Sequence, residues 1–163
     1  MTTEKRILRF NIKNDTFQEL NSHLNVGRED HRCAFIPHTN KIMITGGFHR
    51  NLALNGTEIV DTEDGNVTMA SPMNFERYKH GMGVITFDGE DRLAVFGGFN
   101  GTNKLDSVEL YNTQTMEWEI ADFKLSKEKQ SFGFLTVKLS DIISQLEPIT
   151  KPITQYRCVE TPV

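Results

Sequence analysis

The stretch that decides the fold is "LAVFGGFNGTNKLDSVELYNTQTMEWE", residues 93–119. It runs a short apolar stretch into Gly97 and Gly98, opens into a polar loop, and returns through an alternating stretch to Tyr111 and Trp118. Alternation of apolar and polar residues on both sides of a glycine-containing loop is typical of antiparallel strands. One copy of this pattern would predict a local hairpin and little more.

The same pattern occurs earlier in the chain. The stretch "KIMITGGFHRNLALNGTEIVDTEDGNVTM", residues 41–69, places Gly46 and Gly47 51 residues before the later glycine pair. The later aromatic pair also has counterparts at this spacing: Tyr111 and Trp118 correspond to Val60 and Val67 and, earlier still, to Phe10 and Phe17. A repeat of about 50 residues therefore organises the chain.

Each repeat unit contains four short strands separated by turn signals, and no apolar stripe of helical period. In the later unit these strands lie in "HGMGVITF", "RLAVFGG", "SVELYN" and "TQTMEWEIA". The chain is expected to divide into the third and fourth strands of one unit (1–20), two whole units (21–70 and 71–121), the start of a further unit (122–139) and a non-repeat tail (140–163).

Four antiparallel strands that recur in this way fit a β-propeller blade, and the glycine pair followed by a spaced Tyr and Trp resembles the kelch repeat. The resemblance covers about residues 6–139, and the later unit is its fullest copy, with "ERYKHG", the glycine pair, "ELYN" and Trp118. We therefore predict an all-β fold, an incomplete kelch β-propeller with about two full four-stranded antiparallel blades plus two partial blades. Propellers have about 4 to 8 blades, so we expect a piece of a longer chain; copies that complete a ring as a homo-oligomer, or an open array, are the alternatives.

The repeated glycine and aromatic positions are predicted to be structural. Glycine has no Cβ, so the backbone can approach its neighbours closely and adopt conformations that other residues avoid. A large aromatic side chain can fill the space between successive sheets. The residues in these roles are Gly46, Gly47, Gly97, Gly98, Tyr111 and Trp118.

Composition narrows the classes of partner. The chain has 163 residues, of which 25% are charged, and a net charge of -4. This balance provides no excess of positive charge for phosphates, so we do not expect nucleic acid as a partner. No stretch approaches the roughly 18 apolar residues of a membrane helix, and the start "MTTEKRILRF" has no apolar signal core. We therefore expect a cytoplasmic protein that does not bind membranes.

No pattern of side chains predicts catalysis, a metal or a cofactor. Cys33 and Cys158 form neither a metal-ligand spacing nor a disulfide framework, so they are interpreted as free thiols. The five histidines show no pairing at metal-ligand spacing, and His31 and His80 recur with the repeat, which indicates a structural role. The glycosylation patterns at Asn55 and Asn100 leave one alternative, a secreted, glycosylated or enzymatic propeller.

The loops that differ between the two units are the predicted partner-binding residues, because scaffold positions repeat whereas contact residues need not. Arg28 and Arg77 have two interpretations: they bind loop carbonyls or a carboxylate of the next blade, or they pair with acidic residues of a partner. The loops that follow the glycine pairs, 48–56 and 99–106, contribute His49, Arg50, Asn51, Leu52, Asn100, Asn103 and Lys104.

The sequence therefore predicts a non-catalytic module that binds another protein. The kelch resemblance implies a finer role, since many kelch propellers form the substrate-recognition part of BTB-kelch adaptors of cullin-type ubiquitin ligases. It also implies an alternative role as an actin-associated scaffold. These roles come from the resemblance and not from particular residues.

Overall fold

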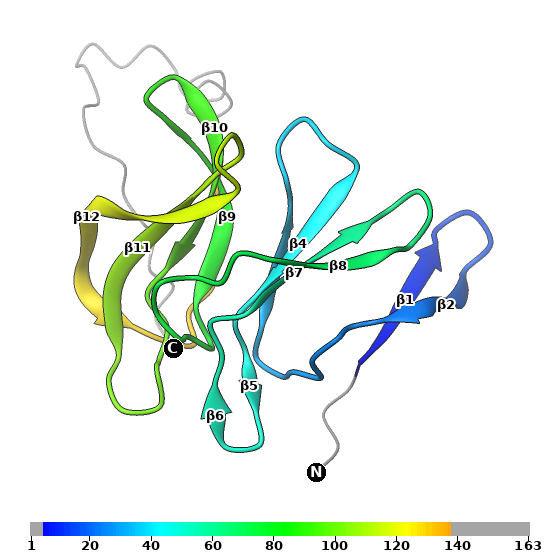
Figure 1. Ribbon diagram of the computed structural model, residues 1–163, viewed down its shortest axis with the longest axis horizontal. Coiled ribbons are helices and arrows are strands. Elements are labelled where there is room, and N and C mark those ends of the chain that lie inside the picture. Colours follow the sequence, from blue (N-terminus) through cyan, green and yellow to red (C-terminus); the bar gives the residue numbers. More distant parts are fainter. Residues whose placement is uncertain (1–4, 138–163) are drawn as a thin grey trace, which may run out of the picture.

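The computed structural model describes residues 5–137, and every regular element in this range is a β-strand. The strands form two four-stranded antiparallel sheets and two separate hairpins (Figure 1). This arrangement confirms the prediction of an all-β fold with two full four-stranded blades and a partial blade before them.

The strand bounds follow the repeat. The N-terminal hairpin consists of β1 (Arg6–Asn11) and β2 (Thr16–His23). The first full blade has the order β3 (Arg32–Phe35), β4 (Lys41–Thr45), β7 (Thr57–Asp61) and β8 (Val67–Ala70). The second has the order β9 (Gly81–Phe87), β10 (Glu90–Phe96), β11 (Leu105–Asn112) and β12 (Glu117–Lys129). A short hairpin, β5 (Phe48–His49) and β6 (Leu52–Ala53), lies between β4 and β7.

The main core lies between the two full blades. Strand residues point alternately to opposite faces of a sheet, so Met43 faces the second blade while its neighbours Ile42 and Ile44 pack toward the N-terminal hairpin. Tyr111 and Trp118 come from the second blade, are 1% and 6% exposed, and have ring centroids 5.2 Å apart. Each full blade is therefore apolar on both faces, as a stack of blades requires.

The N-terminal hairpin has an exposed apolar face. Phe10 and Phe17 lie opposite each other in the β1–β2 ladder, with ring centroids 4.7 Å apart, and are 46% and 70% exposed. They occupy the repeat positions of Tyr111 and Trp118, which the first full blade covers. The hairpin therefore presents the surface that a preceding blade would bury.

The last strand of the second blade extends beyond residue 121, where the sequence predicts the end of the unit. Strand β12 continues to Lys129, because Lys124 and Lys129 still pair with β11. Residues 131–137 form no strand, although Phe132 and Phe134 lie against β9 at Gly81. A strand requires a ladder of hydrogen bonds, and this segment has no such ladder within the described residues. The division into units stays a prediction, and the tail 140–163 lies outside the described residues.

The segment after β12 nevertheless repeats the contact between the two full blades. The backbone N–H of Lys79 donates to the carbonyl of Asp30 over 3.0 Å, and that of Ser131 donates to the carbonyl of Lys79 over 2.9 Å. All three residues have left-handed φ angles of 54°, 54° and 55°. Residues 131–137 therefore sit beside the second blade much as β9 sits beside the first.

Candidate partner-binding face

A buried ion pair fixes the loop between the second and third strands of each full blade. The guanidinium of Arg28 donates to the carboxylate of Glu58 over 2.5 Å and to the backbone carbonyls of Gly46 and Gly56 over 2.8 Å each. Both side chains of the pair are completely buried. Because Gly46 and Gly56 stand at the two ends of the loop that contains the β5–β6 hairpin, Arg28 holds that loop closed at its base.

The carboxylate of Glu58 is fully satisfied by the segment before β3. It accepts hydrogen bonds from the backbone and side-chain amides of Asn25, at 2.6 and 3.0 Å, and from the backbone of Val26 at 3.2 Å. Burial alone would raise the pKa of Glu58, but these hydrogen bonds and the charge of Arg28 outweigh burial and hold the pKa below its ordinary value. Glu58 is therefore ionised at neutral pH.

The second blade contains the same cluster. Arg77 donates to the carboxylate of Glu109 over 2.7 Å and to the carbonyl of Gly97 over 2.6 Å. Glu109 accepts from the backbone and side chain of Asn74 and from the backbone of Phe75. Burial lowers the pKa of Arg77, and the adjacent Glu109 opposes this shift.

These contacts decide between the two interpretations of Arg28 and Arg77. The residues are 3% and 0% exposed, so neither guanidinium is available to a partner. Each bonds loop carbonyls, as the structural interpretation predicts, but its carboxylate belongs to its own unit and not to the next blade. The prediction that Arg28 and Arg77 bind a partner is wrong, because each guanidinium is buried against the carbonyls and the carboxylate that it contacts.

The glycine pairs allow the backbone of neighbouring units to meet. Gly46 has a φ of 57°, and a Cβ there would collide with the carbonyl oxygen of Arg77. The N–H of Gly47 donates to that carbonyl over 2.9 Å, and the N–H of Gly98 donates to the carbonyl of Lys129 over 2.7 Å. Each glycine pair thus lets the chain approach a later backbone carbonyl closely, that of Arg77 after β8 and that of Lys129 at the end of β12.

The first predicted binding loop is a hairpin. Arg50 and Asn51 have φ angles of 46° and 65°, the two left-handed residues of a tight two-residue hairpin turn. The turn is flanked by the pair His49 and Leu52. Arg50 and Asn51 are exposed, Leu52 is 67% exposed and His49 is half-buried, so the tip of this hairpin presents a cation, an amide and an apolar side chain to solvent.

The second predicted binding loop is organised by Asn100. Its side-chain oxygen accepts hydrogen bonds from the backbone N–H groups of Thr102 and Asn103, at 2.9 and 2.8 Å. This arrangement is an Asx turn, so Asn100 shapes the loop and is itself half-buried. Asn103 and Lys104 are exposed and are the residues that this loop offers to a partner.

Three aromatic side chains join the two loops into one surface. The ring of Tyr78 lies 4.8 Å from that of Phe48 at the base of the hairpin and 5.6 Å from that of Phe99 at the start of the second loop. Figure 1 shows the β5–β6 hairpin and the β10–β11 connection at the same end of the sheets. We call this end the loop face: His49, Arg50, Asn51, Leu52, Asn100, Asn103, Lys104 and the row Phe48, Tyr78 and Phe99.

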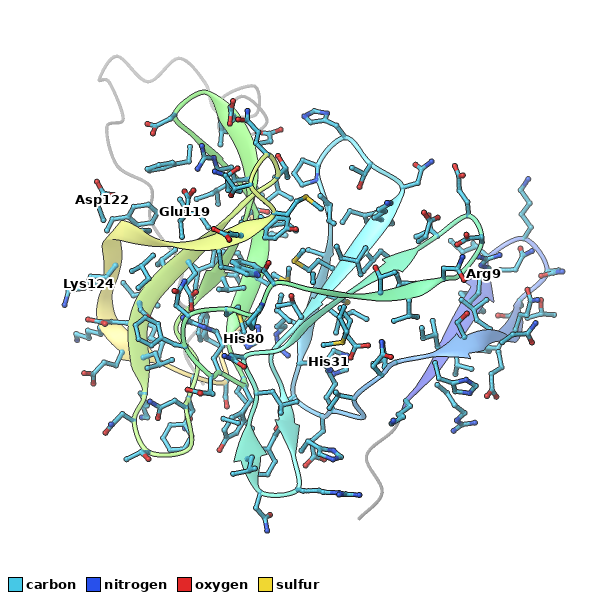
Figure 2. All side chains as sticks on the ribbon, in the orientation of Figure 1. Arg9, His31, His80, Glu119, Asp122 and Lys124 are labelled. Atoms are coloured by element: carbon cyan, nitrogen blue, oxygen red, sulfur yellow. The ribbon has the colours of Figure 1, made fainter. Side chains whose placement is uncertain are left out.

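His80 is buried and His31 is half-buried in the middle part of the fold (Figure 2). His80 is 0% exposed, and its Nε2 lies 2.9 Å from the hydroxyl of Thr45. Burial first, and then the charge of Arg77, lower the pKa of His80 well below its ordinary value. Burial also lowers the pKa of His31. Burial therefore favours the neutral form of both histidines in the folded chain.

This burial predicts a loss of stability in acid. In the unfolded chain a histidine takes up a proton at about pH 6.5, whereas the folded His80 resists protonation. The free energy of unfolding should therefore fall as the pH drops from about 7 to about 5. The His80→Gln variant is expected to be less stable overall but to lose less stability over that range. Urea unfolding at several pH values measures the difference, and parallel losses in variant and parent would contradict the prediction.

The described residues contain no group of three His, Cys, Asp or Glu side chains placed to hold a metal ion. Cys33 is a free, exposed thiol, and Cys158 lies outside the described range.

Asn55 donates its side-chain amide to the carbonyl of Met73 over 3.1 Å, which gives this half-buried residue a role in the fold. Within residues 5–137 there is also no helix of the length and apolar character needed to cross a membrane.

The geometry defines a class of protein, a partial β-propeller whose blades join through paired glycines and carry loops at one end. Residues 91–121 match the family model described as Kelch motif. A stretch of 45 residues is 42% identical to the Kelch repeat-containing protein kel-10 of Caenorhabditis elegans, and it covers 28% of this chain and 7% of that protein. These similarities support a kelch-repeat protein, and kelch repeats generally mediate protein–protein interaction.

Proposed function

We propose that this chain is a non-catalytic recognition module that binds another protein through the loop face. The observation that carries the proposal is the contrast between the buried Arg–Glu pairs and the exposed loop tips. Both blades hold their loops with the same buried Arg–Glu pair, whereas the residues at the loop tips differ completely. A constant scaffold with variable exposed tips is the arrangement of recognition surfaces.

The exposed chemistry of the loop face favours a partner with carboxylates and an apolar contact residue. Arg50 and Lys104 are exposed cations on the two tips, and Lys79 lies with its amine 5.7 Å from the ring centre of Tyr78 between them. Leu52 provides an exposed apolar side chain next to Arg50. Aromatic residues and arginine are enriched at the centres of protein interfaces, whereas lysine is more common at their rims.

We extend the proposal to a finer role, the substrate-recognition part of an adaptor for a cullin-type ubiquitin ligase. The resemblance to kelch propellers supports this role, and the loop face would then hold the substrate. The recruiting domain would have to belong to a longer protein, and cytoplasmic location is part of the same proposal.

The loop face is tested by a fourfold variant, His49→Ala, Arg50→Ala, Asn103→Ala and Lys104→Ala. Arg50, Asn103 and Lys104 are exposed and His49 is half-buried at the hairpin tip, so circular dichroism should show an unchanged fold. A partner captured by the parent chain, identified by mass spectrometry and purified, should bind the variant at least about tenfold more weakly.

The matched control removes two exposed cations elsewhere, Lys13→Ala and Lys41→Ala. Its affinity for the same purified partner should equal that of the parent. If the fourfold variant also retains full affinity in calorimetry, the partner binds another surface and the assignment of the loop face is wrong.

A further inference from the structure

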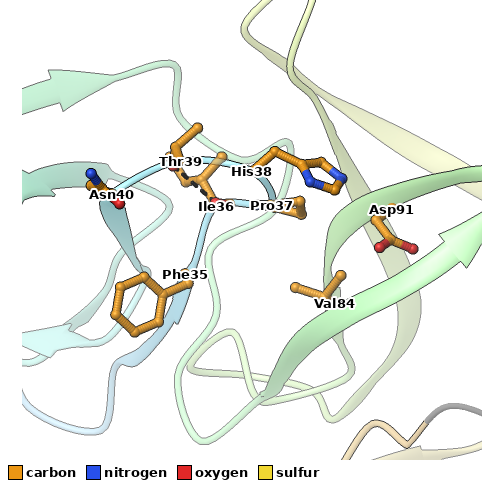
Figure 3. A pocket seen from close by; sticks show the side chains of 8 residues that line it. All are labelled: Phe35, Ile36, Pro37, His38, Thr39, Asn40, Val84 and Asp91. Carbon is orange, nitrogen blue, oxygen red and sulfur yellow. Dashed lines mark hydrogen bonds between the residues drawn. The ribbon is translucent and has the colours of Figure 1, made fainter.

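The two faces of β3 have different neighbours. Ile36 points toward the second blade and belongs to the core between the two full blades. A cleft beside it also has Pro37 and Asp91 in its walls (Figure 3). Phe35 points to the opposite face, because it pairs with Ile42, which packs toward the N-terminal hairpin. Figure 3 shows the ring of Phe35 on the side of β3 that lies away from the second blade.

An apolar patch on this opposite face is exposed. Cys33 lies two residues before Phe35 and so shares its face. Cys33 is an exposed thiol, and Phe35 is 58% exposed. The N-terminal hairpin covers the other half of the blade, where Ile7 packs with Val60 and Val67. We call Cys33 and Phe35 the β3 patch, which among residues 5–137 remains open to solvent.

The second blade shows what covers the equivalent surface. Met82 and Val84 stand 49 residues after the two residues of the β3 patch. Met82 is 9% exposed and belongs to the core between the blades, and Val84 packs against that core. Their cover includes Ala34 and Ile36, which β3 contributes from the facing side. An extended segment with two apolar side chains at alternate positions therefore fits the β3 patch.

Residues 131–137 present such a surface at the far side of the second blade. Phe134 and Thr136 lie against β9. Because side chains of an extended segment point alternately to opposite sides, Leu135 and Val137 point away from β9. They are 83% and 53% exposed. The outer side of this segment is therefore apolar and has no cover among the described residues.

The register of this segment matches that of β3. A left-handed residue precedes each of them, Asp30 before β3 and Ser131 here. Leu135 and Val137 lie four and six residues after Ser131. The two β3 side chains that face the second blade lie four and six residues after Asp30. Leu135 and Val137 thus occupy the positions that, in β3, cover the next blade.

We propose that residues 131–137 of one copy of this chain pack on β3 of a second copy, with Leu135 and Val137 against the β3 patch. The matching register and the two exposed apolar surfaces favour this occupant, since their contact would remove both from water. The proposal does not depend on the loop face, because none of the residues in this contact belongs to it.

The contact favours a closed dimer over an open chain of copies. Each copy carries one segment and one patch, so two copies can satisfy each other in both directions. Two copies with two full blades each would contribute four full blades. Two shared units would join them, each with the N-terminal hairpin of one copy and residues 131–137 of the other. This total lies within the range of about 4 to 8 blades that propellers use.

The test is sedimentation velocity on the whole 163-residue chain over a dilution series. The contact is small compared with the interface of a stable dimer, so separate copies should predominate in dilute solution, where unfolding is measured. The sedimentation coefficient should rise with concentration from that of one copy to that of two copies, and no larger species should follow.

Two variants locate the contact. Phe35→Ser removes the apolar ring of the β3 patch, and the double variant Leu135→Ser with Val137→Ser removes the side chains that meet it. All three residues are exposed in the single copy, so circular dichroism should show an unchanged fold. Each variant should weaken association at least about tenfold. Leu52→Ser, which changes an exposed leucine of the loop face, is the matched control and should leave association unchanged.

A mixture of the two variants tests the direction of the contact. The Phe35→Ser chain keeps an intact segment 131–137, and the double variant keeps an intact β3 patch. One complete contact can therefore form between them, so the mixture should associate more strongly than either variant alone. No gain on mixing would contradict a contact of segment with patch.

Other results would also overturn the proposal. A chain that stays a single copy at every concentration would assign the β3 patch to a different occupant, such as a preceding stretch of a longer protein. Association that both variants leave unchanged would place the contact on another surface. Loss of association in Phe35→Ser, with full association in the double variant, would mean that two patches meet face to face.

Discussion

Replacing Arg77 with Met is expected to lower the free energy of unfolding by about 3 to 5 kcal/mol, the loss associated with a buried charge that has lost its partner. Glu109 would remain completely buried without the guanidinium that it contacts at 2.7 Å. The base of the second loop would also lose its link to the carbonyl of Gly97. Urea unfolding followed by circular dichroism measures the change.

Two further variants separate the charge from the packing. Arg92→Met removes an arginine whose ion pairs with Glu90 and Glu119 lie at the surface, so it should cost no more than about 1 kcal/mol. The double variant Arg77→Met with Glu109→Leu removes both buried charges and should recover a large part of the loss. If Arg77→Met proved as mild as Arg92→Met, the buried pair would not stabilise the blade.

Replacing Trp118 with Ala is expected to cost about 3 to 5 kcal/mol, because it leaves a cavity in the core between the two full blades. Trp118 is 6% exposed and packs with Tyr111, and its backbone carbonyl accepts a hydrogen bond from the side chain of Asn74. The blades would lose the largest side chain of their shared core. The change is measured by thermal and urea unfolding.

The repeat supplies a matched control for this variant. Phe17 occupies the same position in the N-terminal hairpin but is 70% exposed, so Phe17→Ala should cost less than about 1 kcal/mol. The difference between the two variants then measures what burial against a neighbouring blade contributes. Similar costs for the two would indicate that the hairpin face is covered in solution, for instance by association of copies.

The repeat could be read from the sequence because its markers are local. Paired glycines and spaced aromatic residues predicted the two full blades, and Tyr111 and Trp118 lie in the core between those blades. The loops after the glycine pairs were also recognised, and they lie at one end of the blades. These features depend on strand period and turn chemistry, which short stretches of sequence contain.

The partners of the two arginines were missed, although a signal was present. Glu58 and Glu109 are 51 residues apart, and Asn25 and Asn74 are 49 apart, so both sets repeat with the arginines that they contact. A charged residue at a repeated position inside an apolar strand is a sign of a buried pair, because burial of a single charge is costly. This reasoning would have predicted that Arg28 is buried and paired with Glu58.

Other features depend on contacts between units, which periodicity does not describe. The cleft joins Pro37 to Asp91, from two different blades, and nothing local to either residue indicates the other. The extension of β12 to Lys129 depends on its pairing with β11 beyond a bulge. The β5–β6 hairpin is too short for a periodic signal, and Arg50 is an uncommon residue for its left-handed turn position.

The position of each ion pair has a consequence for how such chains gain and lose units during evolution. Arg28 and Glu58 lie within residues 21–70, and Arg77 and Glu109 within 71–121, so both charges of a pair belong to the same stretch of gene. A duplication or deletion of one unit therefore copies or removes a neutral set. If the pairs had joined successive units, the first and last units of an open array would each keep one buried charge without its partner, at a cost of about 3 to 5 kcal/mol. The number of units can thus change without leaving a buried charge unpaired, because each unit contains both members of its pair.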